Sequence, residues 1–157
     1  EGKVVRFAVT DVRAMGRVSK GVRGMRLSAE HRVISMVIPE GNGYLLTVCD
    51  NGYGKRTSTV EFPTKGRGGK GMIAIQASDR NGPLVGATQL FDGDEIMLIS
   101  DQGTMVRTRG DEVSVVGRNT QGVRIIRLKE NENLVSLARI AEPDEIEEGE
   151  SDDLSDE

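Results

Sequence analysis

Four short blocks of sequence recur in the same order along this chain, at intervals of about 50 residues. In the first block a glycine precedes an arginine by four residues, and these arginines are Arg6, Arg56 and Arg107. A repeat of this length is one supersecondary unit, which cannot bury its apolar face alone and has to pack against its neighbours. The repeat therefore restricts the fold to an array of about three similar modules.

Most of the blocks are short apolar runs that are rich in β-branched residues and bounded by glycine turns, which is typical of β-strands. The third block predicts strands at 33–38, 84–90 and 134–140. Asn51-Gly52 predicts a β-hairpin with a type I′ turn. No segment keeps an apolar helical period long enough for a substantial helix.

We therefore expect an all-β fold, built from four-stranded, propeller-like blades. The expected repeats span about residues 1–50, 51–101 and 102–140. The first repeat begins abruptly at Glu1, so we expect further blades to precede it.

Charge is divided unevenly between the repeats and the end of the chain. Residues 1–140 carry 15 acidic and 21 basic side chains, a net charge of about +6, whereas residues 141–157 carry ten acidic side chains and no basic one. Such a segment has too little apolar surface to fold, which predicts a disordered acidic tail. The tail either solubilises the protein or competes with a polyanion for the basic repeats.

The second block combines glycines and cations at the same phase of each repeat, at 16–21, 66–71 and 117–122. Glycine allows backbone N–H groups to approach an anion closely, and Lys and Arg supply the countercharge. Repetition favours an extended polyanion such as duplex DNA, which carries one charge per ~1.7 Å of axis. A curved band of cations would offset the cost of bending DNA, on the order of 1–6 kcal/mol for a 20–30 bp site. The candidate DNA-binding residues are Arg6, Arg17, Lys20, Arg23, Lys55, Arg56, Lys65, Arg67, Lys70, Arg107, Arg118 and Arg124.

Other nucleotide-binding modes fit the sequence less well. A phosphate-binding P-loop is excluded because Lys70 is followed by Gly71 rather than by Ser or Thr. Single-strand binding needs aromatic stacking platforms, and only 3% of the residues are aromatic. Base-specific readout is disfavoured because no recognition helix is visible.

Catalytic and metal-binding constellations are not visible in the sequence. His31 is the single histidine and lies in a polar turn, where a surface position is expected. Cys49 is the single cysteine and lies in an apolar run, which predicts a buried small hydrophobic residue and a reducing compartment. No apolar run approaches the ~18 residues of a membrane span. We therefore expect no catalytic residue and no metal site in this segment.

Several phrases of the sequence resemble one known family. AMGRVSKGVRGMRL, NGYGKRT, EFPTKGRGGKG and VGRNTQGVRIIRL, followed by an acidic tail, are similar to the C-terminal domains of the DNA gyrase A subunits, in the type IIA topoisomerase A-subunit family. The resemblance covers the whole chain and about the last half of such a domain. It implies a six-bladed β-pinwheel with strands exchanged between neighbouring blades, of which about three blades are present here. The basic box of the family is matched only by residues 67–71, with Lys65 and Gly66 in its first positions.

The resemblance also implies a function. Such a domain wraps double-stranded DNA around a basic rim, so that an ATP-dependent type II topoisomerase introduces negative supercoils. The cleaving tyrosine and the site for ATP and Mg²⁺ then belong to other parts of the holoenzyme, so no cofactor is expected here. The implied partners are the rest of the gyrase A subunit and the gyrase B subunit, in the bacterial cytoplasm at the nucleoid and without a membrane. The alternatives are the C-terminal domain of a topoisomerase IV A subunit, or a propeller-like scaffold for protein interactions.

Overall fold

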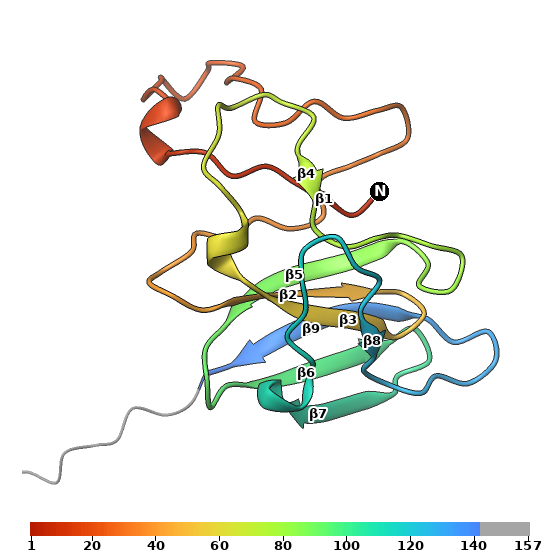
Figure 1. Ribbon diagram of the computed structural model, residues 1–157. Coiled ribbons are helices and arrows are strands. Elements are labelled where there is room, and N and C mark those ends of the chain that lie inside the picture. The colour runs from red at the N-terminus through yellow and green to blue at the C-terminus, as the bar shows by residue number, and fades with distance from the viewer. Residues whose placement is uncertain (142–157) are drawn as a thin grey trace, which may run out of the picture.

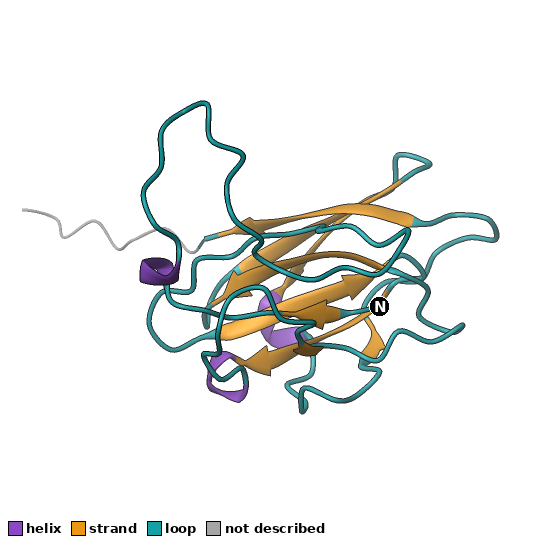
Figure 2. Ribbon diagram, turned by 90° about the horizontal axis from the view of Figure 1, so that it is seen from above, coloured by secondary structure: helices purple, strands orange, loops and turns teal. Residues whose placement is uncertain are grey.

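The computed structural model describes residues 1–141, which form three β-sheets stacked in layers (Figure 1). The strands are β1 Lys3–Val4, β2 Tyr44–Cys49, β3 Tyr53–Ser58, β4 Met72–Ile73, β5 Leu84–Leu90, β6 Glu95–Ser100, β7 Met105–Arg109, β8 Val123–Arg124 and β9 Leu134–Ile140. Helical structure in this part of the chain consists of three single 3-10 turns: η1 Val9–Asp11, η2 Thr59–Glu61 and η3 Gly110–Glu112 (Figure 2). None of these is a helix that could cross a membrane. The expected acidic tail lies outside the described residues, apart from its first residue.

Strands are exchanged between consecutive repeats. The sheets have the orders β1-β4, β5-β2-β3-β8 and β7-β6-β9, and every strand pair in them is antiparallel. β4 comes from the second repeat but pairs with β1 of the first, and β8 comes from the third repeat but pairs with β3 of the second. The expected all-β fold with exchanged strands is confirmed.

The predicted hairpin forms between β2 and β3, but its predicted turn type is wrong. Gly52 has a φ of 85°, whereas Asn51 is not left-handed, and a type I′ turn requires positive φ at both central residues. The Gly52 N–H donates to the Cys49 carbonyl at 3.1 Å, which closes a three-residue loop with the glycine in the left-handed position. The β6–β7 hairpin repeats this turn at Gly103, with a φ of 81°.

The expected repeat boundaries fall inside these two hairpin turns. The boundary at residues 50 and 51 separates β2 from β3, and the boundary at 101 and 102 separates β6 from β7. The first and third units therefore contribute strands to two different sheets, and the second unit contributes strands to all three.

The predicted strand at 33–38 does not form. The matching strands of the next two repeats, β5 and β9, are hydrogen-bonded to β2 and β6, and no strand of residues 1–141 stands in that position for 33–38. The segment instead runs beside β5, where the Ser35 hydroxyl accepts a hydrogen bond from the Ala87 N–H at 3.0 Å. Without a paired strand most of its apolar side chains remain exposed, and Met36 is 85% exposed, whereas Val37 packs against the cluster around Leu45 and Phe62.

The four-stranded sheet lies between two apolar clusters. The larger cluster packs it against the three-stranded sheet and is built around Leu46, Val48, Leu90, Ile96, Leu98, Val113, Ile126 and Leu134. The smaller cluster, built around Leu45, Phe62 and Ala74, packs it against the N-terminal repeat. β2 is consequently buried at five successive positions, whereas β6 alternates between buried and half-buried residues. The sheets on either side cover both faces of β2.

Candidate nucleic-acid interface

The glycine-and-cation loops of the first two repeats lie directly against each other, and the third loop contacts the second repeat just beyond its own loop. The Gly68 N–H donates to the Gly24 carbonyl at 2.8 Å, and the Arg26 N–H donates to the Gly69 carbonyl at 2.8 Å. The Gln76 N–H donates to the Thr120 carbonyl at 2.9 Å, which joins the second repeat to the third. We call the loops 13–26, 64–71 and 117–122 together the basic band.

Two arginines of the band make the same contact one repeat apart. Arg67 donates from Nη1 to the Arg23 carbonyl at 2.5 Å, and Arg118 donates from Nη1 to the Ile73 carbonyl at 2.8 Å. Arg23 and Ile73 are themselves equivalent positions of the repeat. Both arginines are half-buried, and a guanidinium has five N–H donors, so part of each remains open to solvent. The repeat thus places these two equivalent cations in equivalent surroundings.

The left-handed glycines at the ends of these loops serve the strand exchange. Gly71 and Gly122 have φ values of 80° and 77°, and a Cβ on either would collide with a backbone carbonyl of the preceding repeat, that of Val4 or of Gly54. Only glycine allows the chains to approach this closely. Gly66 faces open space, so it remains able to admit an anion.

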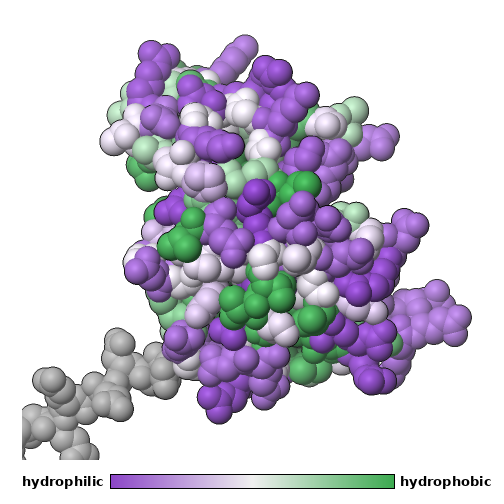
Figure 3. All heavy atoms as spheres, in the orientation of Figure 1, coloured by the Kyte–Doolittle hydropathy of each residue, from purple (hydrophilic) through white to green (hydrophobic). Residues whose placement is uncertain are grey.

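Seven of the predicted DNA-binding residues are exposed: Arg17, Lys20, Arg23, Lys65, Lys70, Arg107 and Arg124. The first five lie in the loops of the first and second repeats. Arg107 lies on β7 and contacts the Glu95 carboxylate, and Arg124 on β8 donates to the Tyr53 hydroxyl at 2.8 Å. Figure 3 shows that hydrophilic residues cover most of one face of the molecule, including its N-terminal part.

Lys55 was predicted to bind DNA, but the structure places it in the interior, where it is 0% exposed. Its Nζ donates to the carbonyls of Gly117 and Arg118, at 2.8 and 2.5 Å, and to the Thr120 hydroxyl at 3.1 Å. Burial lowers the pKa of this amine to about 8. Lys55 therefore holds the third loop of the band in place and cannot reach a phosphate.

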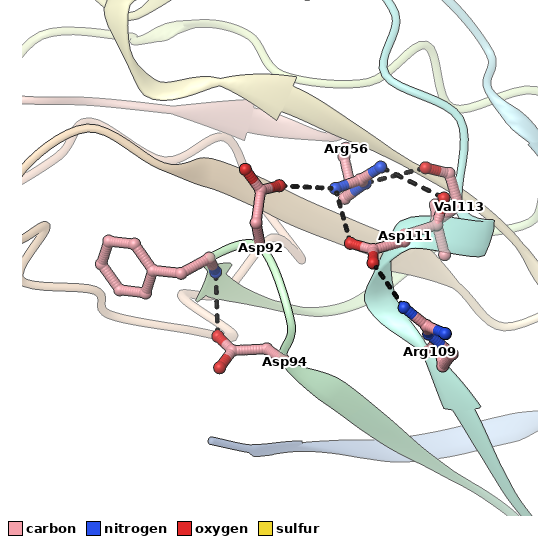
Figure 4. A network of polar contacts seen from close by, with 7 residues as sticks. Arg56, Asp92, Asp94, Arg109, Asp111 and Val113 are labelled. Atoms are coloured by element: carbon pink, nitrogen blue, oxygen red, sulfur yellow. Dashed lines mark hydrogen bonds and ion pairs between the residues drawn. The ribbon is translucent and has the colours of Figure 1, made fainter. Parts of the chain in front are cut away.

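Arg56 was also predicted to bind DNA, and it is only 7% exposed. It donates from Nε to the Val113 carbonyl at 2.8 Å, and the carboxylates of Asp92 and Asp111 each lie 3.9 Å from Nη1 (Figure 4). The guanidinium also stacks on the Tyr44 ring, 4.7 Å from its centroid. These contacts use the cation to join the second repeat to the third.

Arg6 has the same role one repeat earlier, although it is only half-buried. Its Nη1 donates to the carbonyls of Thr59 and Phe62, both at 2.9 Å. Phe62 and Val113 are equivalent positions, so Arg6 and Arg56 each hold the residue that follows the 3-10 turn of the next repeat. We call them the inter-repeat arginines. Sequence reasoning missed this role. The available signal was that both arginines lie in the first block of the repeat and not in its glycine-and-cation loop.

The rest of the described chain offers no group of three or more His, Cys, Asp or Glu side chains that could hold a metal ion. His31 is exposed, with Nδ1 lying 3.5 Å from a carboxylate oxygen of Glu1. Cys49 is buried as predicted, and burial raises the pKa of its thiol to about 11.

The exchanged strands and stacked basic loops define a repeat domain of the propeller class. The model of the family described as "DNA gyrase C-terminal domain, beta-propeller" matches residues 1–40, 43–89 and 94–141. The chain belongs to this family.

Relatives and solved structures agree with this assignment. The chain is 57% identical over 147 residues to the DNA gyrase A subunit of Salmonella typhimurium, covering 94% of this chain and 17% of the relative. It is 57% identical over 143 residues to the DNA gyrase A subunit of Escherichia coli, covering 91% of this chain and 16% of the relative. The chain therefore spans about a sixth of the length of these relatives.

A solved structure of a DNA gyrase A C-terminal domain matches with a TM-score of 0.82 and 31% identity, over 89% of this chain and 48% of that one. The C-terminal domain of DNA topoisomerase IV matches with a TM-score of 0.81 and 20% identity, over 88% of this chain and 44% of that one. The second likeness shows a shared fold alone.

Proposed function

We propose that this chain is a DNA-binding and DNA-wrapping segment of a DNA gyrase A subunit, and that it holds duplex DNA along the basic band. The observation that supports this most strongly is the repeated contact of Arg67 and Arg118, which gives two equivalent cations the same surroundings one repeat apart. A repeated arrangement suits a regular polyanion, because each repeat can present cations to the next stretch of phosphates.

The charges of the band fit phosphate contact rather than base readout. Lys20, Lys65 and Lys70 are exposed, and flexible lysines act as point charges towards phosphates. Contacts to the phosphate backbone position a protein on the duplex but do not read its sequence. We therefore expect binding with little sequence preference, and stronger binding to DNA that bends easily.

The function of the intact enzyme is part of the same proposal. DNA held on the band would be presented to the rest of the gyrase A subunit and to the gyrase B subunit in the bacterial cytoplasm. That holoenzyme would use ATP and Mg²⁺, bound outside this segment, to introduce negative supercoils. The names of the relatives support this, since each of those described above is a DNA gyrase A subunit.

The salt dependence of duplex binding tests the proposal. We expect the logarithm of the affinity to fall linearly with the logarithm of salt concentration, with a slope of about −0.9 for each phosphate contacted. Fluorescence anisotropy on a labelled 30 bp duplex of mixed sequence measures this slope. An absence of binding at low salt, or binding that does not change with salt, would contradict the proposal.

Charge reversal within the band identifies the contacting surface. The triple variant Lys20→Glu, Lys65→Glu, Lys70→Glu should bind at least about tenfold more weakly at low salt, and its slope should be shallower by about 3, because three phosphate contacts are lost. The single variants Lys65→Glu and Lys129→Glu change the net charge equally and form a matched pair, because Lys129 is exposed but lies in the connection between β8 and β9. Equal losses in these two single variants would show that net charge alone, and not the band, attracts the DNA.

A further inference from the structure

The third loop of the basic band is covered by a carboxylate of the chain itself. Glu61, the last residue of the 3-10 turn η2, accepts a hydrogen bond from the Arg118 N–H at 2.9 Å. A Cβ on Gly117 would lie 3.9 Å from the same carboxylate oxygen, so the carboxylate lies over the start of the loop. Carboxylate and phosphate oxygens both accept charge-assisted hydrogen bonds from backbone N–H groups. Glu61 therefore occupies a position that suits a phosphate oxygen.

The equivalent position of the second loop is open. Asp11 and Arg67 are in phase with Glu61 and Arg118. Asp11 meets Arg67 through its backbone carbonyl, which accepts a hydrogen bond from Nε at 3.1 Å. In the described part of the chain no acceptor takes the Arg67 N–H, and a Cβ on Gly66 would meet nothing within 4 Å. The second loop thus leaves open the site that a carboxylate covers one repeat later.

A buried cation lies on the other side of the third loop. The Lys55 Nζ donates to the Gly117 and Arg118 carbonyls, so these carbonyls point into the protein. The position of Lys55 is taken by Val5 one repeat earlier, so the second loop has no such cation beneath it. Burial lowers the pKa of Lys55 to about 8, and the negative charge of Glu61 acts against this shift. The third loop therefore lies between an ammonium group and a carboxylate, and it becomes an anion site when the carboxylate leaves.

We propose that the Arg118 N–H and the start of the third loop form a phosphate subsite, and that the Glu61 carboxylate competes with a DNA phosphate for it. The identity of the ligand rests on the proposed function, whereas the subsite is a property of the loop. Glu61 is exposed, and contacts between exposed charged groups are weak, so its side chain can turn into solvent when a phosphate arrives. The band then has an open second loop and a third loop that contributes only after the carboxylate has left.

Nuclear magnetic resonance of the isotope-labelled, 157-residue chain tests the subsite with inorganic phosphate and without DNA. In Glu61→Ala the Arg118 amide signal should shift at a phosphate concentration at least about fivefold lower than in the wild type, because the competing carboxylate is gone. Glu130→Ala is the matched control, because Glu130 is an equally charged, exposed residue in the connection between β8 and β9. An Arg118 amide that phosphate does not affect in Glu61→Ala, or affects equally in both variants, would overturn the proposal.

The variant Glu61→Asp separates coverage of the subsite from net charge. It keeps the charge but shortens the side chain, and Asp11 at the equivalent position does not accept from the Arg67 N–H. The midpoint of the phosphate titration at the Arg118 amide should therefore fall at least about threefold, because a hydrogen bond depends on distance and charge attraction alone does not. A midpoint equal to that of the wild type would mean that Glu61 acts through its charge and does not occupy the site.

Duplex binding tests whether the same subsite acts on DNA. Glu61→Ala should bind the labelled duplex at least about fivefold more tightly than Glu130→Ala at low salt, with a slope steeper by about 1, because one more phosphate is contacted. Equal or weaker binding would show that Glu61 only supports the loop and would overturn the proposal, even where the wild type shows the salt dependence of the proposed function. If none of these proteins binds DNA, the proposed function and the identity of the ligand both fail, and the phosphate titration decides the subsite by itself.

Discussion

The first 40 residues and residues 51–90 both contain the first three blocks of the repeat, yet the two regions form different amounts of structure. In the second repeat, Leu84–Leu90 is a strand paired with β2, and Leu90 is 0% exposed. In the first repeat, the matching segment 33–38 has no strand, and Met36 is 85% exposed. An apolar, β-branched sequence thus becomes a strand only where a neighbour supplies both a hydrogen-bonding edge and an apolar surface.

The largest expected difference between these two regions is in the loss of unfolding free energy when an apolar side chain of the third block is truncated to alanine. Leu90→Ala should lower the free energy of unfolding by about 2–5 kcal/mol, because it leaves a cavity between the four-stranded and three-stranded sheets. Met36→Ala should change it by less than about 0.5 kcal/mol, because its side chain is already in solvent. Urea denaturation followed by circular dichroism measures both. Similar losses would mean that 33–38 is packed against a partner in solution.

A smaller difference in unfolding free energy is expected between alanine variants of Arg56 and Arg107, which occupy equivalent positions of the repeat. Arg56→Ala should cost about 1–3 kcal/mol, because it leaves the buried Val113 carbonyl without its side-chain donor and removes a cation beside Asp92 and Asp111. Arg107→Ala should cost less than about 0.5 kcal/mol, because its pair with Glu95 is exposed. Urea denaturation followed by circular dichroism measures both variants. Equal losses would contradict the expected difference between a buried and an exposed arginine.

The smallest expected effect is on the melting temperature of variants at Asn81 and Glu132. These two buried residues occupy equivalent positions of the repeat. The Ser100 hydroxyl and the Lys129 N–H donate to the Glu132 carboxylate, at 2.5 and 2.9 Å, and hydrogen bonds from Ser100 and Thr104 lower its pKa to about 2. A lowered carboxyl pKa contributes stability that is present above the unfolded value near 4.5 and is lost as pH falls towards 2.

The melting temperature of the wild type should therefore exceed that of Glu132→Gln at about pH 6, and the difference should shrink between about pH 4.5 and 2.5. Asn81 has no charge to titrate, so Asn81→Ala should lower the melting temperature by an amount that does not follow this pH window. Thermal denaturation across this pH range provides the measurement. A constant difference between the wild type and Glu132→Gln would argue against a charged, hydrogen-bonded Glu132.

Much of the candidate site follows from the sequence because it depends on local features. The loops 16–21, 66–71 and 117–122 are recognisable from glycines and cations that recur in phase. The second loop contacts the first repeat at Gly24 and Arg26, and the third loop contacts the second repeat at Gln76. The sequence did not reveal which cations are exposed. Lys55 and Arg56 are adjacent in β3, which is buried at four successive positions, and only the packing of the next repeat encloses them.

The propensities of a few adjacent residues give the period of the repeat, the strand character of its blocks and the position of its turns. These three features therefore follow from the sequence alone. The division of each repeat between sheets depends on the tertiary structure. Hydrogen bonds between distant strands place β4 and β8 in the sheets of the preceding repeats. The same pairing decided that 33–38 forms no strand and that the inter-repeat arginines face carbonyls rather than solvent. A strand or a buried cation is specified by what lies beside it, and that neighbour is about 50 residues away in the sequence.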